Sequence, residues 1–209
     1  MISISRDYNI FGGALNASNY ITTKKFRMPR LDAETKERIK KLDYQVLQEI
    51  VIKLASKEKP VYDFIRLNYL DKEFAERELF EETKADLEVI FRKRYKGFSE
   101  QLQMANMLGA CIKRINAFTR ISKNRVYEAD LLLHILEIPF SESANKFGTC
   151  FTQFDSKVAL IVKRLVNVVT KKLHEDYKIE YEEAINEYLK ILHHTSRHID
   201  TVHNLPKAI

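Results

Sequence analysis

Four of the six histidines lie close together near the C-terminus, at His193, His194, His198 and His203. Imidazoles bind metal ions and transfer protons near neutral pH, so this cluster is the first candidate for chemistry. His194 and His198 stand four residues apart, the spacing that lets two imidazoles on one helix share a metal ion. A metal site needs further ligands, and the sequence contains neither HExxH nor ExxH. We therefore predict a polar helix face here, with no bound metal and no cofactor.

The same segment places an arginine before a histidine with five residues between them, in Arg197-His198-Ile199-Asp200-Thr201-Val202-His203. This pattern resembles the Arg-x(4 to 6)-His motif of the HEPN ribonucleases, which are all-α proteins. The resemblance covers these seven residues and implies that His203 is an acid and base and that Arg197 stabilises phosphate charge. Cleavage of RNA through its own 2′-hydroxyl needs a proton carrier near neutral pH and a cation beside the phosphorus. A metal-independent ribonuclease is therefore one alternative function.

Other catalytic patterns are missing from the sequence. The glycines form neither GxGxxG nor GxxxxGK[ST], so the usual backbone cradles for nucleotide phosphates are not encoded. Neither cysteine and no serine belongs to a nucleophile motif. An acidic stretch at 71–88 lacks the paired ExxH of di-iron proteins, and we expect it to be a solvated helix face. These observations favour a non-catalytic protein.

Basic residues form the most extensive pattern in the chain. They cluster near the N-terminus, at the end of one predicted helix, around the next turn and along a later helix, where they could follow a phosphate backbone. The alternative is ordinary solubilising charge balanced by nearby acids. The predicted nucleic-acid-binding residues are Lys24, Lys25, Arg27, Arg30, Arg92, Lys93, Arg94, Lys96, Lys113, Arg114, Arg120, Lys123, Arg125, Lys163, Arg164, Lys171 and Lys172.

The net positive charge is concentrated at one end of the chain. The 209 residues contain 35 Lys and Arg against 29 Asp and Glu, a net charge of +6. Residues 1–31 hold five basic residues and one acid, show no helical period and contain Gly12, Gly13 and Pro29. We predict an extended basic N-terminal arm over 1–31, although its composition also fits a transit peptide. Its apolar residues indicate that it binds a protein partner or mediates self-association.

Composition also limits the fold. A hydrophobic fraction of 45% can fill a core, whereas 5 Gly and 4 Pro are too few for the many tight turns of an all-β protein. We therefore predict an all-α protein, an antiparallel bundle of five or six helices over 32–209 that follows the arm.

Apolar residues recur every three or four positions over most of this domain. The fourth predicted helix is apolar nearly all round and should lie centrally, and Gly109 in the third should permit a close helix contact. The predicted helices run over about 32–59, 60–97 with a possible break near Asp71, 99–121, 125–138, 155–175 and 180–203.

Cysteine content and hydropathy bear on the compartment. Cys111 and Cys150 form no CxxC pair, so we expect buried thiols in a reducing, intracellular and most simply cytoplasmic setting. No apolar run approaches the ~18 residues that span a membrane, and we expect no membrane partner.

The sequence predicts a non-catalytic helical binding or assembly module that contacts nucleic acid or another polyanion within a larger complex. Its basic arm and Lys/Arg clusters would make the contact, and DNA and RNA remain equally open. The alternatives are the ribonuclease and a purely structural protein–protein assembly subunit.

Overall fold

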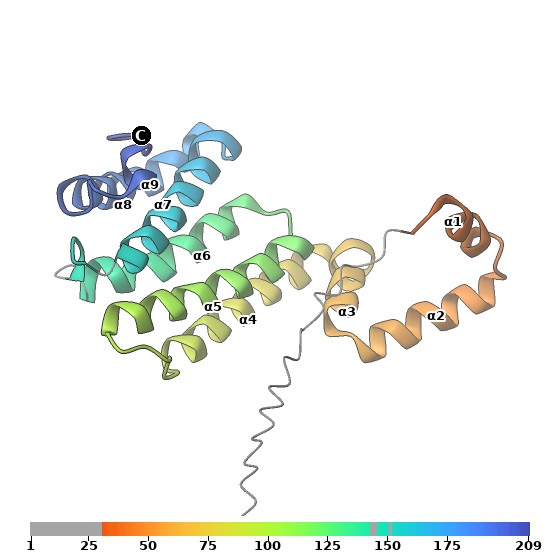
Figure 1. Ribbon diagram of the computed structural model, residues 1–209. Helices are drawn as coiled ribbons and strands as arrows, with labels where there is room; N and C mark the ends of the chain where they lie inside the picture. The colour runs from red at the N-terminus through yellow and green to blue at the C-terminus, as the bar shows by residue number, and fades with distance from the viewer. Residues whose placement is uncertain (1–30, 143–145, 151) are drawn as a thin grey trace, which may run out of the picture. The chain divides into compact units, whose positions relative to one another are not determined.

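The computed structural model describes residues 31–142, 146–150 and 152–209 (Figure 1). These residues are all-α, as predicted, and contain no strand. The α-helices are α1 (Ala33–Lys40), α2 (Tyr44–Lys57), α3 (Lys59–Ile65), α4 (Lys72–Phe91), α5 (Glu100–Ile121), α6 (Arg125–Glu137), α7 (Thr152–Lys172), α8 (Glu175–Thr195) and α9 (Asp200–His203). Two π-helical turns are η1 (Arg66–Leu70) and η2 (Ile138–Glu142).

The chain divides into two units, Met1–Val46 and Leu47–Ile209. The described part of the smaller unit holds α1, whose N-cap Asp32 accepts a hydrogen bond from the amide of Thr35 at 2.6 Å. The prediction of one helix over 32–59 is wrong, because the chain leaves the helical conformation after Lys40. A second helix, α2, begins at Tyr44, where the carboxylate of Asp43 accepts a hydrogen bond from the amide of Gln45.

The predicted apolar stripe of this first helical region is also not in the core. Ile39, Leu42, Val46, Ile50 and Leu54 are each 40–47% exposed, and neither α1 nor α2 has a buried side chain. Their spacing is helical, as expected, but within its own unit none of them is buried.

The core of the larger unit lies among α4 to α9. α6 contacts α4, α5 and α7, and its Leu131, Leu132, Ile135 and Leu136 are fully buried, which confirms its central position. α7 contacts α5, α6, α8 and α9 and buries the predicted valine-rich face. α4, α5 and α6 follow one another as antiparallel neighbours through short connections (Figure 1).

The predicted close helix contact at Gly109 is wrong. A Cβ placed at this residue would meet no atom within 4 Å, so no neighbouring helix approaches it closely.

The second predicted helix breaks at Asp71, as expected, and ends earlier than predicted. α4 stops at Phe91 rather than near Gly97, so the basic residues 92–96 lie in the loop before α5. This loop is fixed on both sides. The Tyr95 hydroxyl donates to the carbonyl of Ile90 at 3.1 Å, and Asn106 donates to the carbonyl of Lys96 at 2.8 Å.

The two cysteines differ in environment. Cys111 is buried, as predicted, and burial raises the pKa of its thiol to about 12. Cys150 is exposed, so the prediction of two buried thiols is wrong for this residue.

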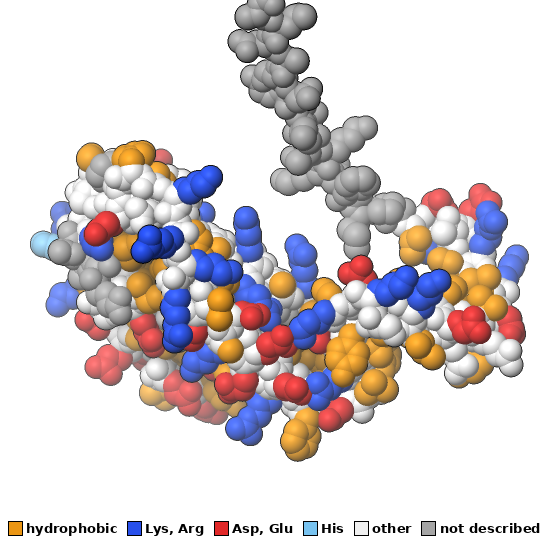
Figure 2. Space-filling model, turned by 90° about the horizontal axis from the view of Figure 1, so that it is seen from below, with side chains coloured by type: hydrophobic (Ala, Val, Ile, Leu, Met, Phe, Trp, Pro, Cys, Tyr) orange, Lys and Arg blue, Asp and Glu red, His pale blue; other side chains and the backbone are white. Residues whose placement is uncertain are grey.

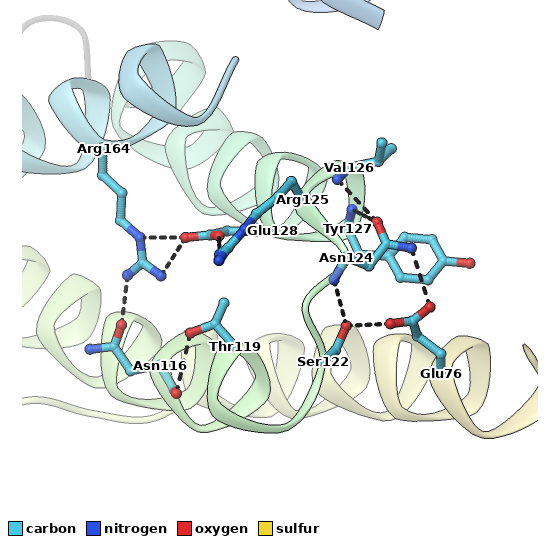
Figure 3. A network of polar contacts seen from close by, with 10 residues as sticks. All are labelled: Glu76, Asn116, Thr119, Ser122, Asn124, Arg125, Val126, Tyr127, Glu128 and Arg164. Atoms are coloured by element: carbon cyan, nitrogen blue, oxygen red, sulfur yellow. Dashed lines mark hydrogen bonds and ion pairs between the residues drawn. The ribbon is translucent and has the colours of Figure 1, made fainter. Parts of the chain in front are cut away.

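A buried carboxylate joins three helices of the core (Figure 3). Glu128 of α6 is 3% exposed, and its Oε1 accepts from Nε and Nη2 of Arg164 on α7 at 3.0 and 2.8 Å. Its Oε2 accepts from Arg125. Nη1 of Arg164 donates to the side-chain oxygen of Asn116 on α5 at 2.6 Å. Because the charges are paired and hydrogen-bonded, the buried carboxylate holds α5, α6 and α7 together.

This network predicts a specific acid sensitivity. Burial disfavours the charged form of Glu128, but the hydrogen bonds from Arg164 and Arg125 outweigh it and hold its pKa below the ordinary 4.5. A carboxyl whose pKa is lower in the folded state stabilises the fold above its unfolded-state pKa, and this contribution is lost as the pH falls through the folded-state value. We expect the free energy of unfolding in urea to decline below about pH 4.5, and to decline less in Glu128→Gln. Equal pH slopes for both proteins would contradict this role.

A candidate anion-binding cleft at the C-terminal end

A cleft of about 680 Å³ lies between α8 and the residues that follow it. Cations and imidazoles dominate its lining, and none of the lining residues is an acid. They are Lys190, His193, His194, Arg197, Val202, His203, Leu205 and Lys207.

The cleft exists because α8 ends at Thr195. Ser196 leaves the helical conformation, is fully buried, and donates from its hydroxyl to Oδ2 of Asp155 on α7 at 2.7 Å. The prediction of one helix over 180–203 is therefore wrong, and Arg197 lies in the turn between α8 and α9. His194 and His198 do not share a helix, and the described residues contain no group of three or more His, Cys, Asp or Glu placed to hold a metal ion.

The segment after α8 is fixed by apolar and polar contacts. Ile199, Val202 and Leu205 are buried in the core. His193 contacts the carbonyl of Pro206 through Nε2 at 3.0 Å, and because a carbonyl only accepts, Nε2 must carry the proton. These contacts hold the turn and the C-terminal segment against α8.

The cations of the cleft are available to a ligand. Arg197 donates from Nε to the carbonyl of His193 at 2.7 Å, which orients the guanidinium, while its terminal nitrogens have no partner among the described residues. Lys190 and Lys207 are exposed and form no ion pair within residues 31–142, 146–150 and 152–209. A guanidinium with free terminal nitrogens beside two ammonium groups suits phosphate oxygens.

A second hollow of about 420 Å³ adjoins the cleft and shares Leu205 with it. It lies between α7 and the C-terminal segment, is lined by Lys163 and Lys171, and has no acid among its lining residues. We call the exposed cations of the two hollows the C-terminal cationic surface. Its members are Lys163, Lys171, Lys190, Arg197 and Lys207.

The structure separates the basic residues that the sequence grouped together. Lys163 and Lys171 belong to the C-terminal cationic surface, and Lys172 is exposed at the end of the same helix. Arg164, next to Lys163, turns inward to Glu128, as does Arg125. Arg114 pairs with Asp86 of α4 at 2.6 Å. Three of the predicted cations thus neutralise acids of the bundle itself.

The remaining predicted cations do not line either hollow. Lys24, Lys25, Arg27 and Arg30 lie outside the described residues. The others are exposed, in the loop before α5 or on α5 and the turn after it: Arg92, Lys93, Arg94, Lys96, Lys113, Arg120 and Lys123.

Sequence reasoning missed Lys190 and Lys207 as members of the site. They are single lysines seventeen positions apart, without the local clustering that marked the other groups. The break after Thr195 brings them to one cleft, and it depends on the contact between Ser196 and Asp155. The signals in this region were the four histidines and the spacing of Arg197 and His203.

Gly148 supports the same turn, and we expect Gly148→Ala to destabilise the protein by at least about 2 kcal/mol. Its φ is +71°, a conformation that costs other residues roughly 1–2 kcal/mol, and a Cβ there would lie 2.6 Å from the carbonyl oxygen of Thr195. Its amide also donates to Asp155 at 2.9 Å. Thermal unfolding followed by circular dichroism measures the effect. The matched control is Gly109→Ala, which should stabilise α5 by up to about 1 kcal/mol; equal effects of the two substitutions would contradict this account.

Comparisons of the chain with known protein families, with curated proteins and with solved structures find no match. In the part of the chain that the structure describes, no helix is both long enough and apolar enough to cross a membrane. The chemistry of the C-terminal cationic surface is therefore the basis for the function proposed below.

Proposed function

We propose that this protein binds nucleic acid through the C-terminal cationic surface, as a non-catalytic module of a larger complex. The observation that carries the proposal is the pair of adjoining hollows on α7, α8 and the C-terminal segment, lined by five exposed cations and by no Asp or Glu. Three other predicted cations instead pair with acids of the bundle, as Arg114 does with Asp86. An unbalanced positive surface of this kind attracts a polyanion.

The extent of the surface favours a chain of phosphates over a single small anion. The cations come from two hollows rather than one, and Lys163 and Lys171 stand eight residues apart on one helix. Two turns of helix separate them by about 12 Å along the axis. Successive phosphates of a nucleic acid strand can contact both lysines with their side chains extended outward.

Binding should follow the law of counterion release, which gives a direct test. A labelled single-stranded RNA of 20 nucleotides and a DNA of the same sequence are titrated with the full chain at 50–400 mM KCl, and fluorescence anisotropy gives the affinity. We expect the logarithm of the affinity to fall linearly with the logarithm of the salt concentration, by ~0.7 for each phosphate contact. An affinity independent of salt, or no binding to either strand, would contradict the proposal. Unequal affinities for the two strands would identify the preferred sugar.

One observation favours a second candidate function, the metal-independent ribonuclease. Arg197 and His203, the two residues that resemble the HEPN motif, line the same cleft. In this reaction His203 accepts the proton of a 2′-hydroxyl as that oxygen attacks phosphorus, the bond to the 5′-oxygen breaks, and the protonated His203 returns its proton to the leaving 5′-oxygen. Arg197 stabilises the charge on the phosphate.

The ribonuclease is tested by incubating RNA with the protein and with His203→Ala in the presence of EDTA. Cleavage by the unaltered chain alone, with ends of cyclic phosphate and 5′-hydroxyl, supports it. DNA lacks the 2′-hydroxyl and should remain intact. Cleavage of RNA by both proteins, or by neither, would exclude the ribonuclease and leave the binding proposal in place.

A further inference from the structure

The helix α2 presents an apolar side that no described element of the larger unit covers. Within the larger unit its Ile50, Val51 and Leu54 share this side and are 40–47% exposed. A helix of 14 residues is marginally stable in water on its own, and most helices gain their stability by packing an apolar side. The apolar side of α2 therefore needs a cover.

Large side chains on α3, η1 and the first turn of α4 extend the exposed apolar surface. Phe64 is nearly half exposed, and Tyr69, Leu70 and Phe74 are 72–76% exposed. The rings of Phe64 and Tyr69 lie edge to face with their centroids 6.1 Å apart. Figure 2 shows hydrophobic side chains gathered beneath α3 and the elements next to it. We call this surface, from Ile50 to Phe74, the apolar face.

The size of the apolar face matches what a stable interface needs. Aromatic side chains bury about 150–250 Å² each, so the exposed parts of Phe64, Tyr69 and Phe74 leave roughly 400 Å² open to water. With the aliphatic side chains of α2 the face approaches the ~800 Å² that each partner contributes to a standard interface. It also exceeds the largest apolar patch of most monomers.

We infer that two copies of this chain associate through the apolar face. The charge of the surrounding segment suits a surface that meets its own copy, since residues 47–74 contain five acids and five bases. Two such segments carry no net repulsion, whereas two C-terminal cationic surfaces would repel each other. Closed two-fold pairing of one patch with itself is also the commonest form of protein assembly. This inference is independent of nucleic-acid binding.

Solution mass of the full chain tests the inference. Light scattering behind gel filtration, over a hundredfold range of protein concentration, should give twice the chain mass of 24.6 kDa at the upper end. Because aromatic residues dominate interface energies, Tyr69→Asp and Phe74→Asp should each raise the dissociation constant of the dimer on the order of 30-fold or more. The matched control is Ile179→Asp on α8, since Ile179 is 74% exposed and lies outside the apolar face. The control should leave the mass unchanged.

A fluorescent reporter shows whether a second copy of the chain covers the apolar face. The chain contains no tryptophan, so Phe74→Trp and Ile179→Trp each report on a single site. We expect the emission of Trp at position 74, but not at 179, to shift to shorter wavelength as the concentration rises. A monomer at every concentration would overturn the inference, whether position 74 is solvated or is covered by another part of its own chain. A dimer whose dissociation constant is unchanged in both Asp variants would overturn it as well.

Discussion

Removal of the buried carboxylate in Glu128→Ala should lower the free energy of unfolding by about 3–5 kcal/mol. Glu128 is the buried shared partner of Arg164 and Arg125, and its loss leaves two partly buried guanidinium groups without their anion. An unpaired buried charge costs more than the pair itself contributes. Urea unfolding at pH 7, followed by circular dichroism at 222 nm, measures the change.

The control for this prediction is Glu82→Ala. Glu82 pairs with Lys59 at 2.9 Å, but its side chain is 41% exposed, and such pairs contribute about 0–1 kcal/mol. Arg164→Ala added to Glu128→Ala should cost less than the sum of the two single losses, because the second substitution removes the charge that the first left unpaired. Equal losses for Glu128→Ala and Glu82→Ala would show that the buried network does not hold α5, α6 and α7 together.

The second large effect is expected on nucleic-acid affinity. The triple variant Lys190→Ala, Arg197→Ala and Lys207→Ala removes three cations from the cleft and should weaken binding of single-stranded RNA about 100-fold in 0.1 M salt. This magnitude follows from ~0.7 logarithmic units of salt dependence for each lost phosphate contact. The slope of affinity against salt should become shallower by about 2.

The matched control removes the same charge elsewhere. Lys36, Arg77 and Lys84 are exposed and line neither hollow, so Lys36→Ala, Arg77→Ala and Lys84→Ala together lower the net charge equally. If net charge alone attracts the nucleic acid, both variants will lose affinity to the same extent. The proposal requires a clearly larger loss in the cleft variant, with unchanged unfolding in both.

Much of the fold was predictable because local signals determine it. Ser99 caps α5, accepting from the amide of Leu102 at 3.2 Å, and the turn at 122–124 separates α5 from α6 as predicted. The side chain of Asn124 caps α6 through the amides of Val126 and Tyr127. The apolar period of α7 likewise predicted its buried face. Caps and periodicity act within a few residues and can be read from sequence.

The end of α8 was not predictable because its cause lies far away in the chain. No proline or glycine stands near Ser196, and the residues beyond it continue the helical period. The helix ends where Ser196 bonds to Asp155, 41 residues earlier. The candidate cleft depends on that break, so the sequence indicated Arg197 and His203 but not their cationic neighbours.

Adjacent basic residues likewise differ in ways that spacing cannot show. Lys163 and Arg164 are neighbours on α7, yet one lines a hollow and the other binds a buried carboxylate. Residues eight apart lie near the same side of a helix, and this spacing correctly grouped Lys163 with Lys171. Whether a cation meets solvent or an internal acid depends on the partner helix, here α6.

The most direct test of the nucleic-acid interface is lysine footprinting. The full chain is acetylated briefly with and without a saturating 20-nucleotide RNA at 50 mM KCl, and mass spectrometry compares the rate at each lysine. The proposal predicts that RNA protects Lys163, Lys171, Lys190 and Lys207, while the exposed Lys84 of α4 reacts at an unchanged rate. Unchanged rates at the four lysines, with RNA bound, would show that the C-terminal cationic surface is not the binding site.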